Sequence, residues 1–82
     1  MKILHIITGR SGSGKSYFAA QLGAKIFEHD EYFDTRGGCL GQVHREMKEY
    51  AQDIAAVIPE SKVKIFKASA IGFGYTPKLH VL

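Results

Sequence analysis

The chain has 82 residues, a length that allows one small domain with a thin hydrophobic core. Apolar residues make up 45% of the chain and charged residues 23%, which is typical of globular proteins and excludes a disordered chain. The net charge is only +3, and the single cysteine, Cys39, excludes an internal disulfide. The apolar run before Thr8 is too short for a signal peptide or a membrane span, so we expect a cytoplasmic protein.

The first third of the chain alternates between apolar runs and glycine-rich sequence. Residues 2–8 (KILHIIT) are predicted to form a strand buried on both faces, because four of the seven are Ile or Leu without alternation. Residues 9–14 favour a loop, and residues 15–22 carry apolar side chains at helical spacing. A second short strand is expected over residues 24–28 (AKIFE).

The rest of the chain is predicted to hold a loop, a long helix and further strands. Residues 36–41 (RGGCLG) favour a loop, either a plain connector or a substrate loop. Residues 43–58 are expected to form one helix, ended by Pro59. That helix rests on five apolar positions at helical spacing: Val43, Met47, Tyr50, Ile54 and Val57. A third strand is expected over residues 62–68 (KVKIFKA), and residues 79–82 favour a last short strand.

A phosphate-binding motif lies between the first strand and the first helix. Gly9-Arg10-Ser11-Gly12-Ser13-Gly14-Lys15-Ser16 matches the Walker A pattern G-x-x-x-x-G-K-[ST] at every position. Glycines let the backbone curl so that its N–H groups point at phosphate oxygens, Lys15 reaches the β- and γ-phosphates, and the Ser16 hydroxyl is a ligand for Mg²⁺. With the adjoining Tyr17, these residues form the predicted nucleotide site. The alternative is a flexible Gly/Ser turn with an incidental lysine.

An acidic segment, residues 29–34 (HDEYFD), follows the second predicted strand. Asp30 comes first after that strand, at the end of the sheet where the Walker A loop also lies. Its carboxylate could take a proton from an acceptor hydroxyl or hold a water on Mg²⁺. The alternative is a solvated turn with a helix cap.

Residues 3–34 resemble the opening of P-loop kinases of the nucleoside, polynucleotide and zeta-toxin type, which share a GxxGSGKS loop and an acidic D-x-x-[YF] element. The resemblance implies that Asp30 is the general base and that Lys15 acts on the transferred phosphate. It also implies Ser16 as the magnesium residue. The predicted metal residues are therefore Ser16 and, through a bound water, Asp30, with Mg²⁺ as cofactor and ATP or GTP as ligand. No carboxylate ends the strand expected at residues 62–68, and no arginine-rich lid follows Arg45.

These patterns together predict an α/β fold: a minimal P-loop βαβαβ unit with a three-stranded, mostly parallel sheet and two main helices. Residues 1–82 are expected to form one truncated P-loop nucleotide-binding domain. The functional hypothesis is a kinase-like phosphotransferase or its remnant. Two alternatives stay open: a non-catalytic protein that sequesters or senses nucleotide or docks on a partner, and a nucleic-acid-associated accessory protein.

The sequence also predicts an interaction with another protein chain. A small parallel sheet leaves at least one edge open, here expected at residues 62–68 or 79–82. We therefore expect a homo-oligomer or a protein partner on that edge, and no membrane association. A second chain could also supply an arginine for phosphoryl transfer.

Overall fold

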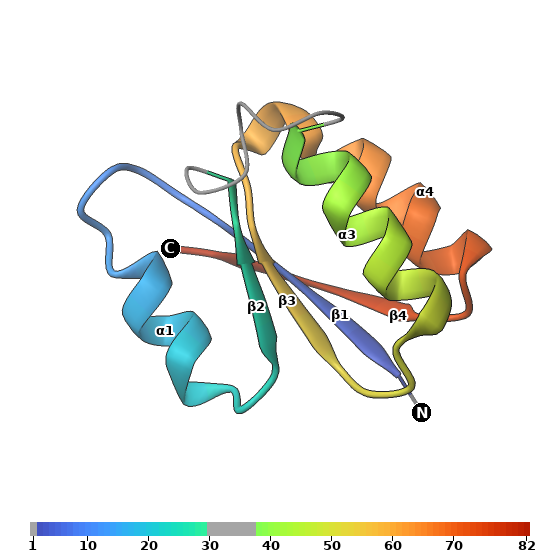
Figure 1. Cartoon of the computed structure of the whole chain (residues 1–82). Helices are drawn as coiled ribbons and strands as arrows, with labels where there is room; N and C mark the ends of the chain where they lie inside the picture. Colours follow the sequence, from blue (N-terminus) through green and yellow to red (C-terminus); the bar gives the residue numbers. More distant parts are fainter. Residues whose placement is uncertain (1, 30–37) are drawn as a thin grey trace.

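The computed structural model describes residues 2–29 and 38–82, which form a four-stranded parallel sheet with helices on both faces (Figure 1). The elements, in chain order, are β1 (Ile3–Thr8), α1 (Lys15–Gln21), β2 (Lys25–Glu28), α3 (Gly38–Glu49), β3 (Ile54–Val57), the 3-10 turn η1 (Glu60–Lys62), α4 (Val63–Gly72) and β4 (Thr76–Val81).

The strands lie in the order β2-β3-β1-β4, and every neighbouring pair is parallel. The connection that leaves β1 runs toward β2 at one edge, whereas the connection that leaves β3 runs toward β4 at the other. The two central strands are therefore neighbours whose connections leave in opposite directions. Such a switch point opens a crevice at the carboxyl ends of the strands, and ligands of open α/β sheets bind there.

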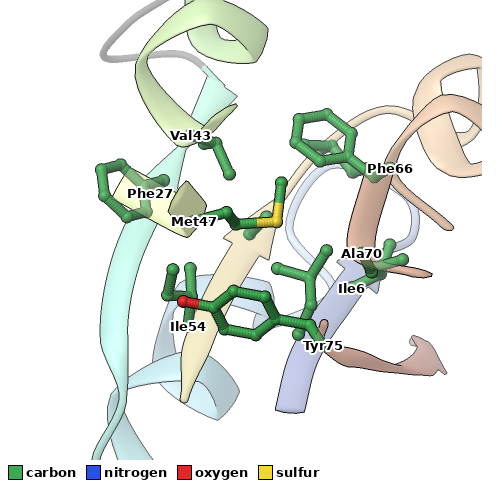
Figure 2. Packing of buried hydrophobic residues seen from close by; sticks show 11 residues of the cluster. Ile6, Phe27, Val43, Met47, Ile54, Phe66, Ala70 and Tyr75 are labelled. Carbon is green, nitrogen blue, oxygen red and sulfur yellow. The ribbon is translucent and has the colours of Figure 1, made fainter. Parts of the chain in front are cut away.

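The larger hydrophobic core lies between the sheet and the helices α3 and α4. Figure 2 shows Val43 and Met47 of α3 and Phe66 of α4 converging over strand residues such as Ile6. All four side chains are almost completely buried. This face carries the largest buried side chains of the chain, so it holds most of the hydrophobic stabilisation.

Among the described residues, α1 is the helix that covers the opposite face of the sheet (Figure 1). Ala19 of α1 packs on Ile7 and Ala55 in a smaller core. Beside this core, His5 Nδ1 lies 3.1 Å from His80 Nε2, so a hydrogen bond joins the side chains of β1 and β4. Burial lowers the pKa of both histidines, which favours the neutral rings that such a bond needs.

The helix predicted over residues 43–58 is wrong in its second half. α3 ends at Glu49, and residues 54–57 form the central strand β3. The apolar spacing of three and four continues by coincidence across the turn at residues 51–53. Asp53 fixes that turn, because its carboxylate accepts a hydrogen bond of 2.8 Å from the backbone N–H of Ile3. Four successive buried residues then suit a strand covered on both faces.

The strand predicted over residues 62–68 is also wrong, because α4 occupies residues 63–72. Phe66 and Ala70, four residues apart, are its two buried positions, whereas Lys64 and Lys67 are exposed. Alternating lysines are typical of an edge strand, but Lys64 and Lys67 lie on the solvent side of this helix. The predicted loop at residues 36–41 is wrong from Gly38 onward, where α3 begins.

The predicted α/β class is confirmed. The sheet has four strands, all parallel, instead of the expected three, mostly parallel strands. The expected strands at residues 2–8 and 24–28, the helix at 15–22 and the last strand at 79–82 all correspond to observed elements. The described residues add a fourth strand and a third helix to the expected unit. No helix in residues 2–29 and 38–82 is long and apolar enough to cross a membrane.

Aspartate substitutions at two alanines of α4 test whether this segment is a helix or a strand. In a strand, Ala68 and Ala70 would share one face, whereas in α4 Ala68 is exposed and Ala70 is fully buried. Ala70→Asp should lower the free energy of unfolding by about 3 kcal/mol or more, because it buries a charge. Ala68→Asp should cost under about 1 kcal/mol. Urea unfolding measures both, and equal losses would contradict the helix.

Candidate functional site

The first six residues of the Walker A loop, residues 9–14, connect the carboxyl end of β1 to Lys15, the first residue of α1. The strands on either side hold its starting point. Ile58 N donates to Ile7 O at 3.0 Å, and Leu82 N donates to Thr8 O at 2.9 Å. The loop therefore leaves the sheet at the switch point between β3 and β1.

Glycine is required at the two ends of the loop. Gly9 has a φ of 155°, and a Cβ placed there would lie 2.5 Å from the carbonyl oxygen of Leu82. Gly14 has a φ of 86°, in the left-handed region, and forms the N-cap of α1. Its carbonyl accepts a bond of 2.9 Å from Phe18 N, which begins the helix. The chain thus turns sharply from strand into helix without a side chain in the way.

The side chain of Lys15 folds back over the loop. Its Nζ donates to the carbonyl oxygens of Gly9 and Arg10, each at 2.9 Å. A third loop bond runs from Ser13 N to Arg10 O at 3.1 Å. The ammonium group therefore lies at the mouth of the loop, where an incoming anion would compete for it against neutral carbonyls. A charge-assisted bond to a phosphate is the stronger of the two.

A cavity of about 320 Å³ opens beside this loop. Its walls come from the loop, from the first turn of α1 and from the ends of β2 and β3: Gly9, Ser11, Lys15, Ser16, Glu28, His29, Val57, Ile58 and Pro59. The volume is at the lower end of the range for small-ligand sites. Three separate segments of the chain meet there, and the parallel sheet is what brings them together.

The predicted site residues divide into two groups in this structure. Gly9, Ser11, Lys15 and Ser16 line the cavity. The other predicted loop residues lie on the exposed side of the loop: Arg10, Gly12, Ser13 and Gly14. Tyr17 is 73% exposed and does not line the cavity. Asp30, the predicted base and metal residue, lies outside the described residues.

Glu28 is a site residue that the sequence interpretation missed. It ends β2, lines the cavity and accepts a hydrogen bond from the Ser16 hydroxyl. One feature of the sequence points to it: Glu28 is a carboxylate at the carboxyl end of a strand beside the Walker A loop. The prediction for Asp30, two residues later, rests on the same feature. Glu28 also completes an apolar strand, and that position by itself predicts only a strand residue.

The strand beside the loop differs from the one expected. The third strand, with no carboxylate at its end, is predicted at residues 62–68, but the strand that lies between β1 and β2 is β3, which ends at Val57. The cavity wall there is apolar, formed by Val57, Ile58 and Pro59. The next carboxylate, Glu60, lines a separate cavity of about 400 Å³ between α4 and β4. Glu28 is therefore the only carboxylate among the described residues that line the loop cavity.

The arrangement suits an anion accompanied by a divalent cation. Backbone N–H groups and one lysine can bind phosphate oxygens. The Ser16 hydroxyl and the Glu28 carboxylate are hard oxygen ligands of the kind that Mg²⁺ prefers, and they are already in contact. The donor set of the cavity therefore fits Mg²⁺ together with a phosphate group.

Comparisons with protein-family models, with curated proteins and with solved structures each gave no match for this chain.

Two glycine variants test the loop conformation itself. Gly12 also has a positive φ, of 79°, but a Cβ there would meet no atom within 4 Å. Gly12→Ala should therefore cost about 1 kcal/mol of unfolding free energy. Gly9→Ala should cost about 3 kcal/mol or more, because backbone strain is joined by the clash with Leu82 O. Urea unfolding of both variants decides the matter, and a Gly9→Ala variant as stable as Gly12→Ala would contradict this loop geometry.

Proposed function

We propose that this chain binds a nucleoside triphosphate, ATP or GTP, together with Mg²⁺, through the Walker A loop at residues 9–16. The observation that carries the proposal is the placement of Lys15 and Ser16 on one cavity at the switch point of a parallel sheet. A complete Walker A sequence gains its meaning from this context, a strand before it and a helix after it. The alternative, an incidental Gly/Ser turn, does not account for a cavity beside the loop at that edge of the sheet.

Within this proposal each residue has a definite task. The loop N–H groups bind and orient the phosphates, and Lys15 exchanges its two carbonyl partners for β- and γ-phosphate oxygens. The Ser16 hydroxyl would be a ligand of Mg²⁺. Bound Mg²⁺ would neutralise phosphate charge, which is the chemistry it supplies in phosphoryl transfer. Adjacent strand ends exclude water from one side of the cavity through Val57 and Ile58.

We propose a kinase-like phosphotransferase, or the remnant of one, as the protein class, following the resemblance of residues 3–34. In that reading Asp30 takes a proton from the acceptor hydroxyl. In the sequence, Asp30 follows Glu28, the last residue of β2, by two residues. The single cysteine cannot form an internal disulfide, which favours a reducing compartment such as the cytoplasm.

A second candidate is a non-catalytic protein that senses or sequesters nucleotide. One observation favours it: the end of β3, beside the loop, is apolar and closes with Pro59. A site that lacks a carboxylate there would hold nucleotide but turn it over slowly. Binding is common to both candidates, and a turnover assay with ATP and GTP separates them.

Lys15→Ala tests the shared claim of phosphate binding. We expect affinity for ATP and GTP, measured by calorimetry with Mg²⁺, to fall at least about 100-fold, because the lysine supplies the charge-assisted bonds. The matched control is Lys25→Ala at the opposite, amino end of β2, where the lysine pairs with Glu46. This control should bind as the parent does. Equal affinity in parent and Lys15→Ala would refute the proposal.

We also propose that a second copy of the chain covers the edge strand β4. The outer edge of β4 faces no other strand in the described residues, and Leu79 and Val81 are substantially exposed. An unpaired edge with apolar side chains is a template for strand pairing. Antiparallel pairing of two β4 strands would join two sheets into one. A nucleic-acid role has less support, since the loop cavity suits a single nucleotide.

Val81→Lys tests the proposed dimer. Val81 and Ile71 are both 70% exposed, but only Val81 lies on the edge strand, so Ile71→Lys is the matched control. In sedimentation at micromolar concentration, parent and Ile71→Lys should be dimers and Val81→Lys a monomer, because an edge lysine blocks strand pairing. A monomeric parent, or a dimer that both variants retain, would show that β4 is not the interface.

A further inference from the structure

We propose that Glu28, at the end of β2, is the metal-side carboxylate of the site, in the role that the apolar end of β3 does not fill. This inference rests on the proposed function and assigns a residue that the Walker A motif does not contain. Three observations support the inference: the face of the sheet on which Glu28 lies, the contact of Glu28 with Ser16, and the apolar lining of the cavity at the end of β3.

The alternation of β2 sets the direction of the Glu28 side chain. Phe27 is buried in the large core beneath α3 and α4, whereas Ile26 packs with the small core beneath α1. Side chains two residues apart along a strand share a face, so Glu28 lies on the α1 face with Ile26. The first turn of α1, with Lys15 and Ser16, lies at the carboxyl end of that same face.

The contact with Ser16 joins the carboxylate to the metal side of the loop. The Ser16 hydroxyl donates to Glu28 Oε1. In a Walker A loop, this hydroxyl turns its oxygen to Mg²⁺. A carboxylate that already holds the hydroxyl is placed to accept the metal, or a water bound to it, once the nucleotide arrives.

The neighbouring strand supplies no competing carboxylate. Glu28 pairs in register with Val57 of β3, and Ile58 and Pro59 complete that wall of the cavity. Glu60 follows, but it lines the separate cavity between α4 and β4. The negative charge that a divalent cation needs beside the loop therefore comes, in the described residues, from β2 rather than β3.

Nucleotide affinity with and without metal tests this assignment. Calorimetry with ATP in EDTA and in Mg²⁺ gives a metal enhancement for each variant. Glu28→Gln keeps an acceptor for Ser16 but loses the charge, so its metal-free affinity should match the parent and its metal enhancement should fall by about tenfold or more. Glu28→Asp should retain part of the enhancement. Glu60→Gln removes an equal charge outside the cavity and should behave as the parent.

Binding of Mn²⁺, followed by electron paramagnetic resonance in the presence of ATP, gives a second readout that needs no catalysis. It should weaken in Glu28→Gln and not in Glu60→Gln. An undiminished metal enhancement in Glu28→Gln overturns the role of Glu28 and leaves nucleotide binding intact. A parent that binds ATP equally well with and without Mg²⁺ overturns the same role. A parent that does not bind ATP at all overturns the proposed function and this inference with it.

Discussion

The pairing of β1 with a parallel strand on each side is the constraint on which the site depends. β1 is hydrogen-bonded to β3 on one side and to β4 on the other, and both pairings run to its carboxyl end. This fixes the point at which the chain leaves the sheet. Gly9 then passes so close to the carbonyl oxygen of Leu82 that a side chain has no room. Loop, helix start and cavity all follow from that exit.

The two faces of the sheet differ in the size of their hydrophobic cores and in the polar groups they hold. The face beneath α3 and α4 holds the larger core, with Phe66 and Met47 fully buried. The face beneath α1 has a small core, and polar groups lie around it, with His5 and His80 at the β1–β4 pair and Glu28 at the end of β2. Stability is thus concentrated away from the site. The site face can accept charged groups because little hydrophobic burial is lost there.

The local part of the fold could be predicted from the sequence, and the part that depends on long-range pairing could not. β1, α1 and β2 are encoded by an apolar run, a glycine loop and helical spacing within residues 2–28. The strand β3 was missed because Ile54 and Val57 continue the spacing of α3. The turn between α3 and β3 depends on Asp53, whose hydrogen-bond partner, Ile3, lies 50 residues earlier in the chain.

The same distinction explains the outcome at the site. The Walker A residues are contiguous, so the motif identified Lys15 and Ser16, and the structure brings both to one cavity. Glu28 reaches that cavity because of the alternation of β2 and the packing of α1 on its face. The strand beside the loop is β3, and its residues continue the helical spacing of α3, so the sequence does not predict which strand lies there. No periodicity within a single segment contains that information.

The central claim is that the loop at residues 9–16 binds the phosphates of a nucleoside triphosphate, and amide NMR of the ¹⁵N-labelled chain tests it most directly. Titration with ATP and Mg²⁺ should shift the amide signals of the loop and of Glu28, because Glu28 and part of the loop line the cavity and the loop N–H groups would bind the phosphates. Adenosine, which has no phosphate, should leave these signals unchanged. Loop signals that stay constant with ATP, or shifts confined to the cavity between α4 and β4, would contradict the account.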